Sequence, residues 1–396
     1  MAKNGKLIAG GIAAGVITAG GVGAYLYLKV IPAVEGTSPV SSAKIVPDEA
    51  LAAGYMEINA ESWDKLRQFG TPEAQKLVFG SFDQATKEVK EELAKEQLDF
   101  AKDIQPWVGS LMVAMVPTEK DAPEMLMVVG IKDKLAALDF ANKIKKKDKL
   151  QVKETKYKDV DILAVTSGGS GSPGYVAILD NHIALSDKET VVKKAIDSAK
   201  GEPSLGSNSE SAKAIENSLN LDNPVAQFYI PNYGKLLEKT AALSGTAPLP
   251  PTLLNQVKSV SVGMGIDKEG IRIKGITTVD PNQFKWEFKP VPGKILAEFP
   301  ANTLLSANGG GLSQQWAMLL KQFESVPELK QGLDESRQQI RQATQLDLDK
   351  DIISWMDGEM AIALIPSKEG ILAPIGVGGT LIFKTSNRKT AEATLA

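Results

Sequence analysis

The chain has 396 residues, of which 43% are hydrophobic and 23% charged, a composition that indicates a folded protein with room for two or three domains. It contains no cysteine, so disulfides, thiolate metal sites and lipid-modified cysteines are excluded. Three lysines flank the first apolar segment, and the remainder holds 42 basic against 48 acidic residues, a balance of −6. That negative charge argues against nucleic acid as a partner.

The first apolar segment runs from Leu7 to Leu28 without a charged side chain. A helix rises about 1.5 Å per residue, so this length crosses a hydrocarbon core of roughly 30 Å. We therefore predict a cytoplasmic N-terminus at residues 1–6, a transmembrane helix at 7–28, and an extracytoplasmic location for the rest. A cleaved signal peptide is the alternative, since Ala33 is small, although Ile31 departs from the usual cleavage pattern.

Small residues recur every four positions in this segment, at Gly11, Gly15, Ala19 and Gly23. On a helix they share one face, an arrangement that lets two transmembrane helices approach closely. The spacing predicts a helix-packing face, for a second copy or another membrane protein. The alternative is that glycine and alanine are simply common in membrane segments.

Residues 29–46 are small and polar, which predicts a flexible linker. A first α+β module is predicted at 47–280, where strand-like and amphipathic helical patterns alternate. The expected strands lie at 55–58, 111–116, 125–131, 175–179, 183–185, 257–266 and 271–279. The expected helices lie at 61–69, from Thr71 and Pro72 onward, at about 134–146, and up to Gly201.

Several polar residues stand where helices are expected to begin. Ser186 and Glu189 have the spacing of a capping box for the helix that ends at Gly201. Asn59, Asn232 and Asn308 each follow a short apolar run, which predicts that their side chains cap the next helix.

A repeated pattern, Asp-x-x-x-Asp-Ile-x-x-Trp, occurs within residues 98–107 and again within 346–355. Each occurrence follows a long helical pattern and precedes a strand that closes at a proline, which predicts two copies of one module. The repeated positions expected to be structural are Asp103, Trp107, Asp351 and Trp355.

The repeat sets the rest of the expected organisation. A connector is predicted at 281–298 and a second α+β module at 299–396. The second module stops before it matches the later hairpins of the first, so we expect it to be truncated. The predicted fold class is α+β, with an N-terminal transmembrane helix followed by duplicated modules of antiparallel sheet with covering helices.

The lysine-flanked anchor, the Pro47-Asp48-Glu49 opening and the repeated Asp/Trp pattern together resemble a family of membrane-anchored proteins of cyanobacterial type. That family is catalogued as a domain of unknown function. The resemblance covers most of the chain and implies an extracytoplasmic location at a thylakoid or plasma membrane. It implies no catalytic residues.

Residues that carry chemistry are few. His182 is the only histidine, follows an expected hairpin turn, and is predicted to be a surface or edge-strand residue. The run Asp347, Asp349 and Asp351 imitates the start of a calcium loop, but Ile352 and Gly358 replace the required glycine and glutamate. The glycine-rich stretches 168–174 and 309–311 lack the Gly-Lys-Ser/Thr of a phosphate loop. We therefore assign no catalytic, cofactor or metal residues.

Three functions remain in order of preference. The first is a noncatalytic, single-pass membrane-anchored binding or scaffold protein with a helix or protein partner. The second is a carrier of lipid or another apolar ligand, because curved antiparallel sheets can enclose apolar cavities. The third is a hydrolase that uses carboxylates alone, such as a glycosidase.

Overall fold

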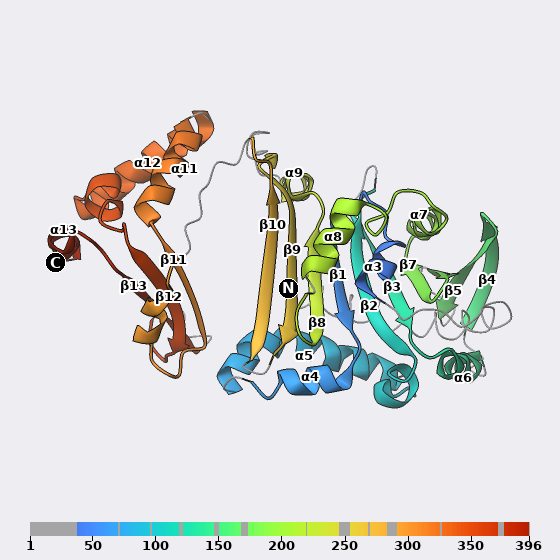
Figure 1. The fold of residues 1–396 in the computed structure, drawn as a ribbon. Coiled ribbons are helices and arrows are strands. Elements are labelled where there is room, and N and C mark those ends of the chain that lie inside the picture. Colours follow the sequence, from blue (N-terminus) through green and yellow to red (C-terminus); the bar gives the residue numbers. More distant parts are fainter. Residues whose placement is uncertain are drawn as a thin grey trace. The chain divides into compact units, whose positions relative to one another are not determined.

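The computed structural model describes residues 38–69, 72–95, 97–118, 122–145, 150–167, 173–218, 220–244, 254–267, 270–282, 291–324, 327–370 and 376–395. They form two compact units (Figure 1). The described residues of unit 1 are 38–69 and 79–282, and those of unit 2 are 72–78 and 291–395. Helices combine with antiparallel strands in both, which confirms the predicted α+β class.

Unit 1 contains an antiparallel sheet whose ten described strands run in the order β10-β9-β8-β1-β2-β3-β7-β6-β5-β4. The strands are β1 Ala52–Glu57, β2 Val108–Val116, β3 Glu124–Ile131, β4 Leu150–Tyr157, β5 Val160–Ser167, β6 Gly174–Leu179, β7 His182–Ser186, β8 Pro224–Ile230, β9 Val257–Ile266 and β10 Ile271–Val279. The hairpins β2/β3, β6/β7 and β9/β10 confirm the strands predicted at 111–116 and 125–131, at 175–179 and 183–185, and at 257–266 and 271–279.

Helices cover both faces of this sheet. They are α3 Pro39–Ala43, α4 Ala60–Leu66, α5 Pro72–Lys95, the π-helix η2 Phe100–Ile104, α6 Lys134–Lys145, α7 Glu189–Ala199, α8 Ser209–Ser218 and α9 Tyr233–Ser244. On one face α3, α7 and α8 pack over a buried cluster that includes Met112 and Ile196. On the other, η2, α6 and the end of α5 enclose a cluster around Leu93, Trp107 and Phe140. Figure 1 shows α4 and α5 lying across one end of the strands.

The expected flexible linker at 29–46 is wrong for residues 38–46. Ser38 and Ser41 form a reciprocal capping box that starts α3 at Pro39. Ser42 and Ala43 are fully buried, and the Ser42 hydroxyl lies 3.1 Å from Nε2 of His182. Small side chains let this helix approach the sheet closely, so a composition typical of linkers here serves packing.

Unit 2 has a smaller antiparallel sheet with the described order β11-β12-β13. Its elements are the 3₁₀-helix η3 Lys294–Glu298, β11 Leu305–Gly310, α11 Leu312–Glu324, α12 Pro327–Thr344, the π-helix η4 Leu348–Ile353, β12 Glu359–Pro366, β13 Val377–Phe383 and α13 Arg388–Leu395. The chain passes between units within the predicted connector 281–298, and it also does so on either side of residues 72–78, which the predicted first module 47–280 had included. However, η3 contacts β11 and β12 and buries Ile295 completely, so the end of that connector belongs to unit 2.

The helix caps differ in part from the sequence prediction. Asn59 and Asn232 cap α4 and α9, since each side chain accepts a backbone N–H of the first turn. Asn308 does not cap a helix, because it lies inside β11. The capping box at Ser186 is also wrong: α7 begins after Lys188, and the Ser186 hydroxyl instead donates to the carbonyl of Met125.

The two asparagines give a matched test of capping. Asn232→Ala is expected to destabilise α9 by about 1 kcal/mol, because Oδ1 of Asn232 accepts the N–H of Lys235 at 2.8 Å. Asn308→Ala is expected to change the stability of its own region by no more than about 0.5 kcal/mol, because the side chain is exposed and its bond to Oε1 of Glu359 is long, at 3.3 Å. Amide hydrogen exchange in α9 and β11 measures both effects. Equal effects at the two positions would contradict the assignment.

Candidate functional site

The first repeated segment folds into a closed set of hydrogen bonds. Asp99 caps η2 by accepting the N–H of Lys102 at 2.9 Å, and Oδ2 of Asp103 accepts the N–H of Asp99 at 2.8 Å. The indole N–H of Trp107 donates to the carbonyl oxygen of Asp103 at 2.8 Å. Trp107 is 1% exposed and stacks on Phe140 with ring centroids 5.5 Å apart.

The second repeated segment makes the same bonds around η4. Oδ2 of Asp351 accepts the N–H of Asp347 at 2.7 Å, and the indole N–H of Trp355 donates to the carbonyl oxygen of Asp351 at 2.9 Å. Trp355 is 4% exposed and meets Phe383 edge-on at 5.7 Å. In both units the aspartate and the tryptophan therefore hold the π-helix and the turn that follows it.

The other predicted site residues lie elsewhere. Gly11, Gly15, Ala19 and Gly23, with the whole predicted span 7–28, lie outside the described residues. Among the residues that the structure does describe, none of the helices combines the length and apolar character needed to cross a membrane.

His182 is buried, which corrects the expectation of a surface or edge position. It lies at the start of β7, between β3 and β6, and is 4% exposed. Burial lowers the pKa of His182 to about 4, against the opposing charge of Asp180. The imidazole is neutral at pH 7. Its partner Ser42 is also buried, so this Ser–His pair offers no surface to a substrate.

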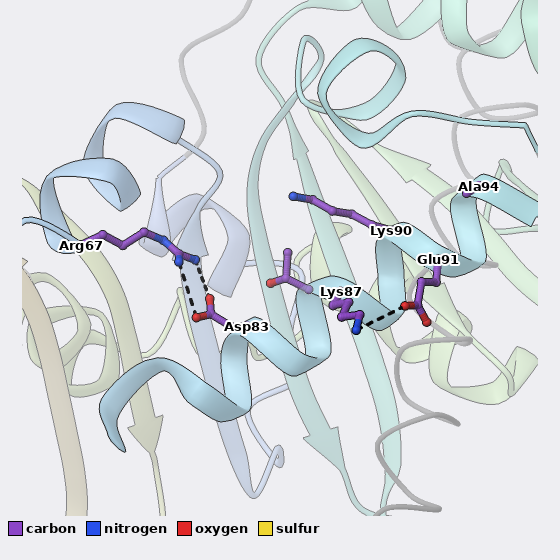
Figure 2. A pocket seen from close by; sticks show the side chains of 7 residues that line it. Arg67, Asp83, Lys87, Lys90, Glu91 and Ala94 are labelled. Atoms are coloured by element: carbon purple, nitrogen blue, oxygen red, sulfur yellow. Dashed lines mark hydrogen bonds and ion pairs between the residues drawn. The ribbon is translucent and has the colours of Figure 1, made fainter. Parts of the chain in front are cut away.

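A polar groove of about 400 Å³ follows α5 (Figure 2). It is lined by Arg67, Asp83, Thr86, Lys87, Lys90, Glu91 and Ala94. Asp83 of α5 pairs at 2.5 Å with Arg67, which lies at the end of α4, and Glu91 pairs at 3.9 Å with Lys87 on α5 itself; Figure 2 shows both pairs. Each carboxylate thus faces a cation, which is unlike the pair of facing acids that a glycosidase uses.

A second feature of unit 1 is an apolar surface that we call the open face, formed by Met115, Met125, Phe228, Val262, Met264 and Ile273. Residues directly opposite on neighbouring strands share a face, and the register pairs Met115 with Met125, Phe228 with Val262, and Met264 with Ile273. Gly54 on β1 lies between the β2 and β8 parts of this face, because it is opposite Val113 on one side and Phe228 on the other.

Helices leave much of the open face exposed. Met115 and Met125 are 38% exposed, Phe228 is 45% exposed and Ile273 is 66% exposed. The cluster of Leu66 and Phe79 reaches Met264 but covers only one end. Contiguous exposed apolar side chains of this kind mark interaction sites. Sequence reasoning missed this surface, although the runs in β2 and β3, apolar at successive positions, were a signal that both faces of these strands are apolar.

Among the described residues, no three His, Cys, Asp or Glu side chains are grouped so as to hold a metal ion. No curated protein and no solved structure matches the chain. A family profile does match, over residues 11–396, with the description "Protein of unknown function (DUF3352)". This match covers nearly the whole sequence, including both units and both Asp/Trp segments, and the chain therefore belongs to the DUF3352 family.

Proposed function

We propose that this protein is a noncatalytic, single-pass membrane-anchored binding or scaffold protein whose partner docks on the open face of unit 1. The main observation in support is a row of exposed apolar side chains across the strands from β3 to β10. It runs from Met125 through Met115 and Phe228 to Ile273. An uncovered apolar surface of this kind costs free energy in water, and a partner removes that cost by covering it.

The composition of the open face suits a protein partner. Methionine side chains are flexible and adapt to irregular apolar surfaces, and an aromatic residue such as Phe228 provides a large area for contact. The face carries methionines on three strands, at Met115, Met125 and Met264. The alternative ligand is an acyl chain, as the carrier function requires.

The location forms part of this proposal. The uncharged segment 7–28 would hold the chain in a thylakoid or plasma membrane with both units on the extracytoplasmic side. Outside the flanking lysines the chain carries a formal charge of −6, so anionic lipid headgroups would repel the two units.

We also infer that the two units are copies of one module. In support, both units contain the same order of elements: a strand, two helices, a π-helix, a pair of strands and a helix. In unit 1 these are β1, α4, α5, η2, β2, β3 and α6. In unit 2 they are β11, α11, α12, η4, β12, β13 and α13. Backbone hydrogen bonds at the two ends of the first strand pair also correspond between the units. Between β1 and β2 they run from Leu51 N–H to Met115 O and from Ile58 N–H to Gly109 O. Between β11 and β12 they run from Leu304 N–H to Leu364 O and from Gly311 N–H to Gly358 O.

Photo-crosslinking tests the proposed site. The full chain, carrying benzoylphenylalanine in place of Phe228, is illuminated in its native membrane. We expect a covalent adduct with one protein, and the same protein when the probe replaces Ile273. A Lys in place of Met115 is expected to reduce the adduct at position 228 at least tenfold, because a charge on the face opposes apolar docking.

The matched control places the probe at Leu135, an exposed leucine on α6 that is 73% exposed and outside the open face. An adduct of equal yield at Leu135 would contradict specific docking. Adducts with acyl lipid in place of protein, identified by mass spectrometry, would favour the carrier function. Absence of any adduct at Phe228 would overturn the proposal.

A further inference from the structure

Residues 38–44, which we call the strap, are the first described segment of unit 1 and contain α3. The strap packs against α8, β2 and β3. The backbone N–H of Gly206 donates to the carbonyl oxygen of Ala43 at 2.9 Å, and the Ser42 hydroxyl lies 3.1 Å from Nε2 of His182. The Ser42–His182 pair is therefore part of what holds the strap on the sheet.

The strap lies close to the rest of unit 1 but buries little apolar area. A Cβ atom at Gly206 would lie 2.5 Å from the backbone nitrogen of Lys44 and 2.7 Å from the carbonyl oxygen of Val40, so the two backbones are in contact. The other residues of the strap are small, and Ser42 and Ala43 are fully buried. A short segment held in this way opens more readily than the paired strands beneath it.

His182 is the group at this contact that can gain a charge. Its neighbours there do not ionise: Gly130 and Leu179 lie directly opposite it on β3 and β6, and Ser42 contacts it from the strap. Asp180, in the turn before β7, is the charge that acts on the imidazole, and burial outweighs its effect on the pKa of His182. The closed strap therefore disfavours the protonated imidazole.

Charged side chains on the elements packed around β7 are engaged elsewhere or exposed. Lys44, at the end of the strap, is exposed. The helix α7 packs on β7, and its charged residues, like Glu124 of β3, lie in ion pairs. The pairs are Glu189 with Lys193, Lys194 with Glu49, Asp197 with Lys158, and Glu124 with Lys188. A proton gained at His182 is therefore the change in charge that this contact registers.

We propose that the strap is released by acid: protonation of His182 drives residues 38–44 off unit 1 while the described strands stay paired. A protonated imidazole carries a charge and an N–H group on each ring nitrogen. The closed strap keeps water from this charge, because Ser42 and His182 are both buried. Lifting the strap lets water solvate the imidazolium, so each proton gained favours the open state.

Release would lengthen the chain between segment 7–28 and unit 1 by seven residues, up to about 23 Å when extended. This consequence rests on the proposed membrane anchoring, whereas the release itself does not. The strap also lies on the face of the sheet opposite the open face. Met115 of the open face stands between Ala114 and Val116, which belong to the same buried cluster as Ala43, and side chains alternate along a strand. The docking proposal and this one therefore fail separately.

Thiol labelling with a maleimide tests the release in the full chain, which has no cysteine of its own. Ala43→Cys places a buried thiol in the strap, and Val192→Cys places one on α7 in the same buried cluster. Ser306→Cys, at an exposed position of β11, gives the intrinsic reactivity at each pH, by which the other rates are divided. The relative rate of Ala43→Cys is expected to rise about twenty-fold from pH 7 to pH 5, because the pKa of His182 is about 4 when buried and about 6.5 when exposed.

Two comparisons separate release of the strap from unfolding of the whole unit. Ala43→Cys is expected to react at least tenfold faster than Val192→Cys at both pH values, because the strap opens while α7 stays in place. With His182→Gln added, which keeps a polar side chain that does not titrate, the relative rate of Ala43→Cys is expected to be the same at pH 7 and pH 5. Equal rates at positions 43 and 192 would overturn the proposal. A rate at position 43 that does not rise with acid, or a rise that persists with His182→Gln, would do the same.

Discussion

Trp107→Ala is expected to lower the unfolding free energy of unit 1 by about 3 to 5 kcal/mol, the largest effect of any single substitution considered. The side chain is 1% exposed, stacks on Phe140, and gives its N–H to the carbonyl of Asp103. Alanine removes the packing, leaves a cavity and removes the hydrogen bond to the Asp103 carbonyl oxygen. Because two units need not unfold in one step, amide exchange in β2 and β3 is the appropriate measurement.

Trp355→Ala is the matched variant in unit 2. It removes the same indole bond to Asp351 and the contact with Phe383, so faster exchange is expected in β12 and β13. Trp107→Phe is expected to cost less than Trp107→Ala, because the aromatic contact with Phe140 is kept. Exchange in β2 and β3 unchanged by Trp107→Ala would contradict a structural role for the repeated pattern.

Much of this fold was predictable from local patterns. The hairpin β6/β7 is predictable because two short apolar runs flank a two-residue polar turn, and β9/β10 because apolar residues alternate before a short polar turn. The Asp/Trp pattern is visible in the sequence because the same residues recur at the same spacing in 98–107 and 346–355. Asp103 and Asp351 each accept a backbone N–H four residues earlier, a local bond that sequence spacing can indicate.

Other elements depend on tertiary structure. The strand β4 was missed because Gln151 to Lys156 are all exposed, so no buried face produces an apolar alternation. The helix α3 was missed because its residues are small, and only their fit under α7 and α8 makes them core. Asn308 was misassigned because an asparagine after an apolar run looks alike in a strand and before a helix.

The open face was not predictable for a similar reason. The runs in β2 and β3 are apolar on both faces, and such runs ordinarily indicate burial on both. Whether Met115 and Met125 are covered depends on how far α5 reaches across the sheet, a distance that no local pattern records. Leu66 of α4 and Phe79 of α5 meet Val225 and Ile266 at one end of the face, and Phe228 stays exposed.

The stability of unit 1 is expected to fall by roughly 2 kcal/mol between pH 7 and pH 5 because of His182. Burial lowers the pKa of this imidazole to about 4 in the folded chain, while the unfolded chain binds a proton near pH 6.5. Between these values the unfolded state holds more protons, so stability rises with pH and is lost as pH falls from 6.5 towards 4. Exchange at α3 reports the loss, since Ser42 contacts the imidazole.

The assignment to His182 is direct, because this is the only histidine in the chain. Glu57, whose pKa burial raises, acts in the opposite direction, since its protonated form is favoured in the folded state. His182→Gln is expected to lower stability at pH 7, where the bond to Ser42 is altered, and to abolish the change between pH 6.5 and 5. A variant that kept the full change over this interval would show that another group titrates, and the burial of His182 would then have no effect on stability at these pH values.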